Sequence, residues 1–115
     1  MQYKIEYSSL ANKSLNEIYD YIADILLEPK TAQNIVLGIM STINSLNELP
    51  KRHKLCDEDF LKNKNIRSTH FKNYKILYFI DDNSFTVTIV NIFYSKRNIN
   101  NVIIYTIIST FFCLW

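Results

Sequence analysis

Cysteine and histidine are scarce in this chain, and none stands in a metal-binding pattern. Cys56 and Cys113 lie far apart, and neither belongs to a CxxC pair or to a Cys/His cluster with zinc spacing. His53 and His70 are separated by a lysine-rich stretch. A structural zinc ion and a disulfide framework are therefore not expected. The start of the chain lacks the charged and apolar regions of a signal peptide, so we expect a cytoplasmic protein.

Glycine is almost absent, since Gly38 is the only one among 115 residues. The loops that cradle phosphates in nucleotide-binding enzymes need closely spaced glycines, so this class is excluded. No hydrolase triad is recognisable either, and we expect no cofactor. Gly38 falls inside a helical pattern, which favours close packing of another element over a functional role.

Long apolar runs are also missing, with one partial exception at the C-terminus. Residues 102–115 carry no charged side chain. These 14 residues fall short of the roughly 20 that a membrane helix needs. We therefore predict a domain over 1–101 and an apolar extension over 102–115, which docks on the domain or mediates self-association. We expect no contact with a membrane.

The charge is small in total but uneven along the chain. Thirteen Lys and Arg against eleven Asp and Glu give a net charge of +2. Residues 1–50 hold three basic and six acidic side chains, whereas residues 51–115 hold ten basic and five acidic ones. This asymmetry indicates that the C-terminal half faces an anionic partner, either nucleic acid or an acidic protein segment.

The N-terminal half shows one strand pattern and two helix patterns. Residues 2–7 alternate polar and apolar side chains, which predicts a half-buried strand. From Ala11 to Leu26 the apolar residues recur at helical spacing, and Ser8 or Ser9 can cap the start. A second helix is predicted from Pro29 to Leu49-Pro50. The short connection predicts an antiparallel helical hairpin.

The C-terminal half is rich in β-forming residues. Residues 51–65 show no period and predict an exposed connection, with Phe60 and Leu61 as anchors. Three strands are expected at 66–72, 74–80 and 85–94, separated by stretches of hairpin length. The predicted fold class is α+β with the order β-α-α-β-β-β. A helical hairpin packs on one face of a mainly antiparallel sheet of about four strands, and the other face stays partly open.

The candidate functional residues are basic and aromatic side chains on or beside the late strands. They are Arg67, His70, Lys72, Tyr74, Lys75, Tyr78, Tyr94, Lys96 and Arg97. Lys and Arg can hold phosphates and stabilise negative charge in a transition state, while tyrosines offer stacking faces for bases. This combination suits RNA binding or cleavage. The alternative is that the tyrosines are ordinary sheet residues beside lysines on a solvated edge.

Five segments follow one another in the predicted order of elements: IYDYIA at 18–23, EPKTA at 28–32, IR at 66–67, NYKILY at 73–78 and FYSKRN at 93–98. In their order and spacing they resemble the RelE/ParE superfamily, the toxins of type II toxin–antitoxin systems. The resemblance covers about residues 3 to 98. It implies a RelE/ParE-like fold, a toxin that inhibits growth or stabilises a plasmid, and a cognate antitoxin as partner.

The nuclease branch of this superfamily cleaves messenger RNA in the ribosomal A site. In that branch, the resemblance implies catalytic roles for Lys75 and Arg97, which would stabilise or protonate the leaving oxygen, and for Arg67, which would grip the backbone. His70, Lys72, Tyr74, Tyr94 and Lys96 would bind nucleic acid. Ribosome-dependent messenger RNA cleavage is our first hypothesis from the sequence.

Two alternatives stay open. RelE-type nucleases often have a tyrosine about six residues beyond the strand-four arginine, but the first tyrosine here is Tyr105. ParE-type members bind DNA gyrase and need no catalytic residues, and the long helical hairpin resembles theirs. A third possibility is a degenerate, non-toxic interaction module. In both toxin hypotheses, an antitoxin segment with acidic and apolar residues covers the basic face or the open sheet edge.

Overall fold

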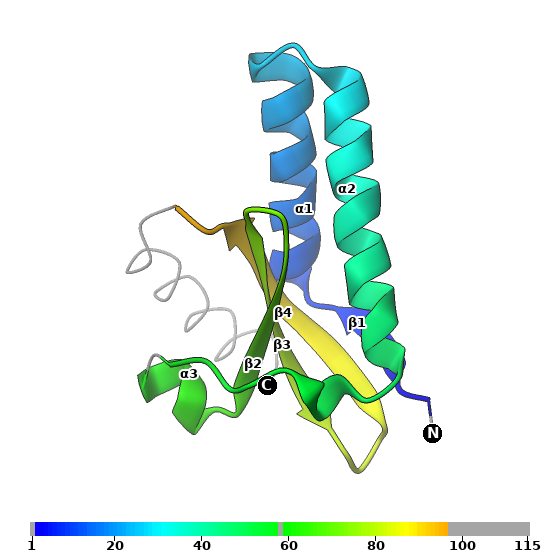
Figure 1. The fold of residues 1–115 in the computed structure, drawn as a ribbon, viewed down its shortest axis with the longest axis vertical. Helices are drawn as coiled ribbons and strands as arrows, with labels where there is room; N and C mark the ends of the chain where they lie inside the picture. The colour runs from blue at the N-terminus through cyan, green and yellow to red at the C-terminus, as the bar shows by residue number, and fades with distance from the viewer. Residues whose placement is uncertain (1, 58, 97–115) are drawn as a thin grey trace.

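The computed structural model describes residues 2–57 and 59–96, except for the side chain of Phe60. The elements in chain order are β1 (Lys4–Tyr7), α1 (Ser9–Asp20), the π-helical turn η1 (Tyr21–Ile25), α2 (Pro29–Asn44), the 3-10 turns η2 (Ser45–Asn47) and η3 (Pro50–Arg52), α3 (Asp59–Asn63), β2 (Ile66–Phe71), β3 (Tyr74–Asp81) and β4 (Thr86–Tyr94). Helices α1 and α2 form the expected antiparallel hairpin (Figure 1). The predicted β-α-α-β-β-β order is confirmed, with the short α3 added before β2. The predicted extension at 102–115 lies outside the described residues.

The four strands form one mixed sheet in the order β1-β4-β3-β2. The pairs β2–β3 and β3–β4 are antiparallel, as expected for strands joined by short turns. Strand β1 instead runs parallel to β4, with Lys4 opposite Thr86. The first strand of the domain therefore lies beside its last one.

The side chain of Ser8 fixes the start of α1. The Ser8 Oγ accepts a hydrogen bond from the Ala11 backbone nitrogen at 3.0 Å, which is the expected N-cap. The same hydroxyl donates to the Val90 carbonyl at 2.8 Å and so ties the helix to β4. At the far end of the helical hairpin, Leu27 takes the left-handed conformation (φ 56°) that reverses the chain before Pro29. With almost no glycine available, an ordinary residue makes this turn.

The main core lies between the helical hairpin and one face of the sheet. Apolar residues from both helices meet residues of β3 and β4 there, and the fully buried members are Ala11, Ile39, Ile43, Leu46, Ile76, Tyr78, Val87 and Ile89. Helix α2 also approaches the β2–β3 turn. A Cβ added at Gly38 would lie 2.1 Å from the Phe71 Cζ, so the close packing predicted for Gly38 is confirmed.

The opposite face of the sheet carries a second, smaller core, made of Cys56, Leu61, Ile66, Leu77, Val90 and Phe93. We expected this face to stay partly open. Part of it is covered instead, because the segment before β2 folds over it and buries Leu61, which is 1% exposed. The register between β3 and β4 shifts at Leu77/Tyr78, a β-bulge that lets Ile89 and Ile92 face the same core.

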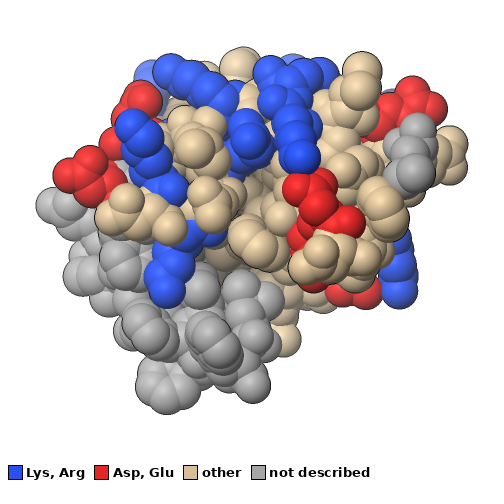
Figure 2. Space-filling view, turned by 90° about the horizontal axis from the view of Figure 1, so that it is seen from below, with Lys and Arg blue, Asp and Glu red and all other residues tan. Residues whose placement is uncertain are grey.

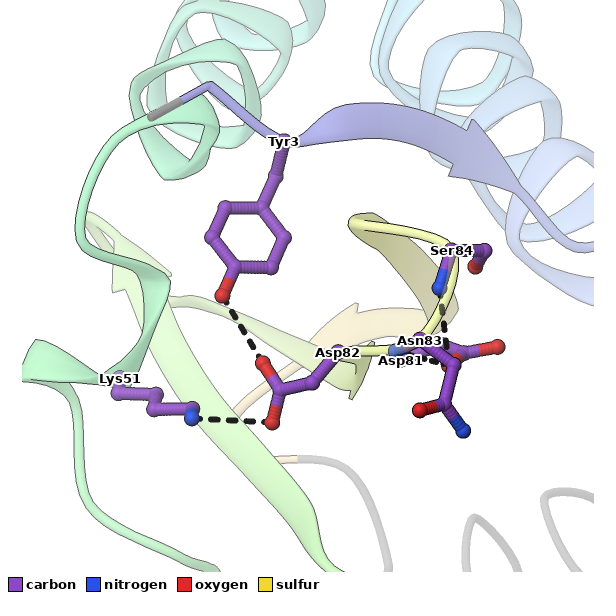
Figure 3. A network of polar contacts seen from close by, with 6 residues as sticks. All are labelled: Tyr3, Lys51, Asp81, Asp82, Asn83 and Ser84. Atoms are coloured by element: carbon purple, nitrogen blue, oxygen red, sulfur yellow. Dashed lines mark hydrogen bonds and ion pairs between the residues drawn. The ribbon is translucent and has the colours of Figure 1, made fainter.

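A polar network joins three distant segments at one end of the sheet (Figure 3). The Tyr3 hydroxyl donates to Asp82 Oδ1 at 2.9 Å, and Lys51 Nζ lies 2.9 Å from Asp82 Oδ2. The bonds from Lys51 and Tyr3 hold the pKa of the Asp82 carboxyl below its usual value. Because the network is exposed, it contributes little to the stability of the fold. Its structural effect is to hold the start of the chain and η3 beside the β3–β4 turn.

Candidate functional site

A basic hollow of about 650 Å³ opens beside the edge strand β2. Its lining residues are Arg52, His53, Lys54, Ser68, Thr69, His70, Lys72, Lys75 and Ser95. No Asp or Glu from the described part of the chain is among them. Lys and Arg side chains crowd the upper part of the face seen from below (Figure 2). The hollow is thus a place where an anion meets several cationic groups at once.

One wall of the basic hollow is the arm formed by residues 50–54, which hydrogen bonds hold against the sheet. The Tyr78 hydroxyl donates to the Pro50 carbonyl at 2.6 Å. The Arg67 Nη1 donates to the His53 carbonyl at 2.7 Å, and the Ser68 nitrogen donates to the Lys54 carbonyl at 3.4 Å. The arm therefore extends the sheet at the outer edge of β2.

The other wall is the β2–β3 hairpin. His70 lies opposite Lys75 in the antiparallel register, so their side chains share a face of the sheet. Lys72 occupies the tight turn between the strands with a φ of 51°. This turn brings Lys72 to the rim of the hollow that Lys75 and His70 also line. Three of the predicted residues are thus brought together.

Burial and neighbouring charges shift two pKa values near the basic hollow. Partial burial lowers the pKa of His53 below its usual 6.5, and the charges of Arg52 and His70 lower it further. Burial raises the pKa of Tyr78 to about 12. At neutral pH, the lowered pKa favours a neutral His53, and Tyr78 keeps the proton that it donates to Pro50.

Arg67 does not join the basic hollow. It lies opposite Tyr78, whose side chain belongs to the core under the helices, whereas Lys75 belongs to the other face of the sheet. The alternation of side chains along a strand therefore separates Arg67 from Lys75. Lys96 is exposed after the end of β4 and does not line the hollow. Arg97, the third predicted catalytic residue, lies outside the described residues.

The two predicted tyrosines line a different pocket, the aromatic groove, of about 590 Å³. The rings of Tyr74 and Tyr94 are 5.6 Å apart. The groove lies between the end of the sheet and the first helix, and it is lined by Ser14, Glu17, Ile18, Tyr21, Ile22, Leu26, Tyr74, Ile92, Phe93 and Tyr94. Burial raises the pKa of Tyr74. Its tyrosines are thus separated from the lysines of the basic hollow.

The residues that the sequence analysis missed are Arg52, His53 and Lys54. They belong to a stretch without hydrophobic period, which we expected to be an exposed connection. The sequence feature that could have indicated these residues is the basic run directly after Pro50. Nothing in that run indicates that it would pair with the edge of β2, because this contact depends on the tertiary fold.

Within residues 2–57 and 59–96, no group of three or more His, Cys, Asp or Glu residues is placed to hold a metal ion. In the same part of the chain, no helix is long and apolar enough to cross a membrane. The Lys, Arg and His side chains that line the basic hollow can offer electrostatic attraction, hydrogen-bond donation and proton transfer.

The family model of the ParE toxin of type II toxin–antitoxin systems (parDE) matches residues 5–99. The chain belongs to the ParE toxin family. No curated protein matches this ParE-family chain in sequence. Among solved structures, it is similar to a chain of the RelBE2 toxin–antitoxin complex from Mycobacterium tuberculosis, with a TM-score of 0.60 and 19% identity over 82% of this chain and 99% of the other.

A second similar structure is the chromosomal ParDE toxin–antitoxin system from P. aeruginosa. Its TM-score is 0.65, with 15% identity over 79% of the ParE-family chain and 94% of the other. At these identities the likeness concerns the fold, and it confirms the RelE/ParE-like architecture expected from the sequence. Together with the family match, it identifies the ParE-family chain as a toxin component of a type II toxin–antitoxin system.

Proposed function

We propose that this ParE-family toxin inhibits growth by binding DNA gyrase, without cleaving RNA, and that a cognate antitoxin keeps it inactive. The observation that supports binding over cleavage is the separation of Arg67 from Lys75 on the two faces of the sheet. Phosphoryl transfer needs its cationic groups to converge on one phosphate. The bond from Arg67 to the His53 carbonyl gives the guanidinium a structural role instead.

Purified gyrase provides the direct test. Supercoiling of a relaxed plasmid is measured with increasing toxin, and cleaved plasmid is scored after denaturation. We expect supercoiling to fall and double-strand breaks to accumulate, and induced cells to form filaments and switch on a DNA-damage reporter. Normal supercoiling at a large molar excess of folded toxin would refute the proposal.

Ribosome-dependent messenger RNA cleavage is the second candidate, and the basic hollow favours it. His70 and Lys75 lie side by side, with Lys72 at the rim, and such groups can bind a phosphate and move a proton. Transcripts are mapped after induction of the parent and of Lys75→Gln. Lys62→Gln, an exposed lysine on α3, is the matched control. New ends at ribosome-bound codons that vanish only in Lys75→Gln would favour cleavage, whereas intact transcripts in the parent rule it out.

The antitoxin is the proposed partner because both similar structures are toxin–antitoxin complexes. The basic hollow offers cationic contacts to the acidic residues of such a segment, and the aromatic groove offers apolar contacts to its apolar residues. Co-expression of a short acidic open reading frame found beside this gene should restore growth. It should fail to do so when its acidic C-terminal residues are neutralised, since the charge attraction to the basic hollow would then be lost.

A further inference from the structure

We propose that the basic hollow binds the phosphodiester backbone of a nucleic acid strand without reading its bases. This goes beyond the inhibition of gyrase, which needs a protein contact alone. Three features of the hollow support this proposal: its charge, the type of side chain that lines it, and the hydrogen bonds that hold the arm against the sheet.

The charge of the basic hollow is available to a ligand. Lys54 pairs with Asp57 at 3.8 Å, but both side chains are more than 80% exposed, so the pair is weak. Among the described residues, neither Lys72 nor Lys75 forms an ion pair with a carboxylate. The attraction of these lysines for an anion is therefore not cancelled by a neighbouring carboxylate in that part of the chain.

Both terminal nitrogens of Arg52 already donate hydrogen bonds within the protein. Its Nη1 donates to the Glu48 and Leu49 carbonyls at 2.6 and 3.3 Å, and its Nη2 donates to the carbonyl and hydroxyl oxygens of Ser45 at 3.2 and 3.1 Å. Arg52 therefore adds positive potential. Lys54 on the arm is held only by its weak, exposed pair with Asp57, and Lys72 on the hairpin only by a contact of 5.6 Å between its Nζ and the centre of the Phe71 ring, so both can reach phosphate oxygens together with Lys75. Because the arm and the β2–β3 hairpin both carry lysines, a nucleic acid strand that passes between them can be held from both sides.

Among the described residues, the lining of the basic hollow holds no Tyr, Phe or Trp ring on which a base could stack, which favours contact with the backbone over contact with the bases. Non-specific single-strand binders stack bases on aromatic rings, with a contribution of about 1–3 kcal/mol per base. Tyr74 and Tyr94 line the aromatic groove, and no Tyr, Phe or Trp within residues 2–57 and 59–96 lines the basic hollow. Phosphate contacts alone give binding that depends strongly on salt and little on sequence.

Arg67 acts on the basic hollow as a positioning residue. Its bond to the His53 carbonyl fixes the arm that carries Lys54, although its own side chain lies on the other face of the sheet. A lysine at this position keeps one donor for the same carbonyl, whereas a methionine of similar length has none. Comparing the two substitutions therefore distinguishes the effect of the hydrogen bond that positions the arm from the effect of side-chain packing.

The test measures binding of the full chain to fluorescent oligonucleotides by anisotropy, over a range of salt concentrations. Single-stranded RNA, single-stranded DNA and duplex DNA of one sequence are compared with a scrambled set. The variant Lys72→Gln/Lys75→Gln is compared with Lys13→Gln/Lys30→Gln, which removes the same charge from the exposed sides of α1 and α2. Far-UV circular dichroism verifies that each variant is folded.

We expect Lys72→Gln/Lys75→Gln, the variant of the β2–β3 hairpin, to bind oligonucleotides roughly tenfold or more weakly. The slope of log affinity against log salt should fall by about 1 per lysine removed. The control variant should change both quantities much less. Arg67→Met should lower the salt slope, and Arg67→Lys should restore it. Tighter binding of RNA identifies a transcript as the source of the phosphates, and tighter binding of duplex DNA identifies the DNA held by gyrase.

Equal losses in the hairpin and control variants would overturn the proposal, because attraction by net charge would then explain all binding. No binding of any oligonucleotide at low salt would overturn it too. A large difference between the original and scrambled sequences contradicts the claim that bases are not read. Each of these results leaves the gyrase proposal standing, since that proposal is judged by supercoiling without added oligonucleotide.

Discussion

The buried hydroxyl of Tyr78 gives a prediction whose size follows from the structure. Tyr78 is fully buried, and its hydroxyl donates to the Pro50 carbonyl at 2.6 Å. Tyr78→Phe removes this donor and leaves a buried carbonyl without it, which costs about 1–3 kcal/mol. For a domain of this size, each kcal/mol lowers the melting temperature by roughly 3–6 °C.

The same residue predicts a dependence on alkaline pH. Burial raises the pKa of Tyr78 from 10.0 to about 12, so the folded state favours the neutral phenol more than the unfolded chain does. This preference stabilises the fold fully below pH 10 and is lost as the pH rises towards 12. A shift of two pKa units corresponds to about 2.7 kcal/mol. The free energy of unfolding of the parent should therefore fall by about this amount relative to that of Tyr78→Phe.

Urea unfolding followed by circular dichroism measures both effects, at neutral pH and at several values between pH 10 and 12. The other tyrosines and the lysines ionise in both proteins, so the difference between the two curves isolates Tyr78. Tyr94→Phe is the matched control, because its ring is 40% exposed, and it should change the stability little. Parallel curves for parent and Tyr78→Phe, or equal stability at neutral pH, would refute the reasoning.

Three further substitutions test the fold by thermal and urea unfolding. Gly38→Ala should lower the free energy of unfolding by about 1–3 kcal/mol, because the added Cβ meets the Phe71 ring. Adding Phe71→Leu to the same chain should recover part of this loss. A gain in stability from Gly38→Ala would contradict the contact. Leu27→Gly should be neutral or stabilise by up to about 1 kcal/mol, since Leu27 is exposed with a positive φ, and a clear loss would show that its side chain packs. Ser8→Ala should cost about 1 kcal/mol, because Ala11 loses its N-cap partner, and unchanged stability would exclude the cap.

Periodicity along the chain predicted most of the fold. The helical spacing from Ala11 and from Pro29 placed both helices, and the β-rich segments placed three strands, because each element buries one continuous stripe. The helix α3 was missed, since its five residues are too few to show a helical period. The β-bulge at Leu77/Tyr78 depends on how two strands fit the helices, and no local pattern records it.

The site was predicted less well, although part of the signal was present. Lys72-Asn73 is a two-residue turn, and it places Phe71 opposite Tyr74. Counting outward from that pair puts Arg67 opposite Tyr78, on the face away from Lys75. The separation of the two cationic residues thus follows from the turn length, and a register count would have found it. The pairing of the arm at 50–54 with β2 could not be found in this way, because it joins segments without a common pattern.

The parallel pairing of β1 with β4 affects how the protein can fold during its synthesis on the ribosome. The Ser8 hydroxyl and the Val90 carbonyl, which close this end of the fold, are 82 residues apart in sequence. At ordinary translation rates of about 5–20 residues per second, the first strand waits roughly 4–16 s for its neighbour to be synthesised. Until β3 and β4 are synthesised, the apolar side of the nascent helical hairpin lacks the strands against which it packs. A ribosome stalled within β4 would hold an incomplete, aggregation-prone polypeptide, because β1 would lack the strand with which it pairs.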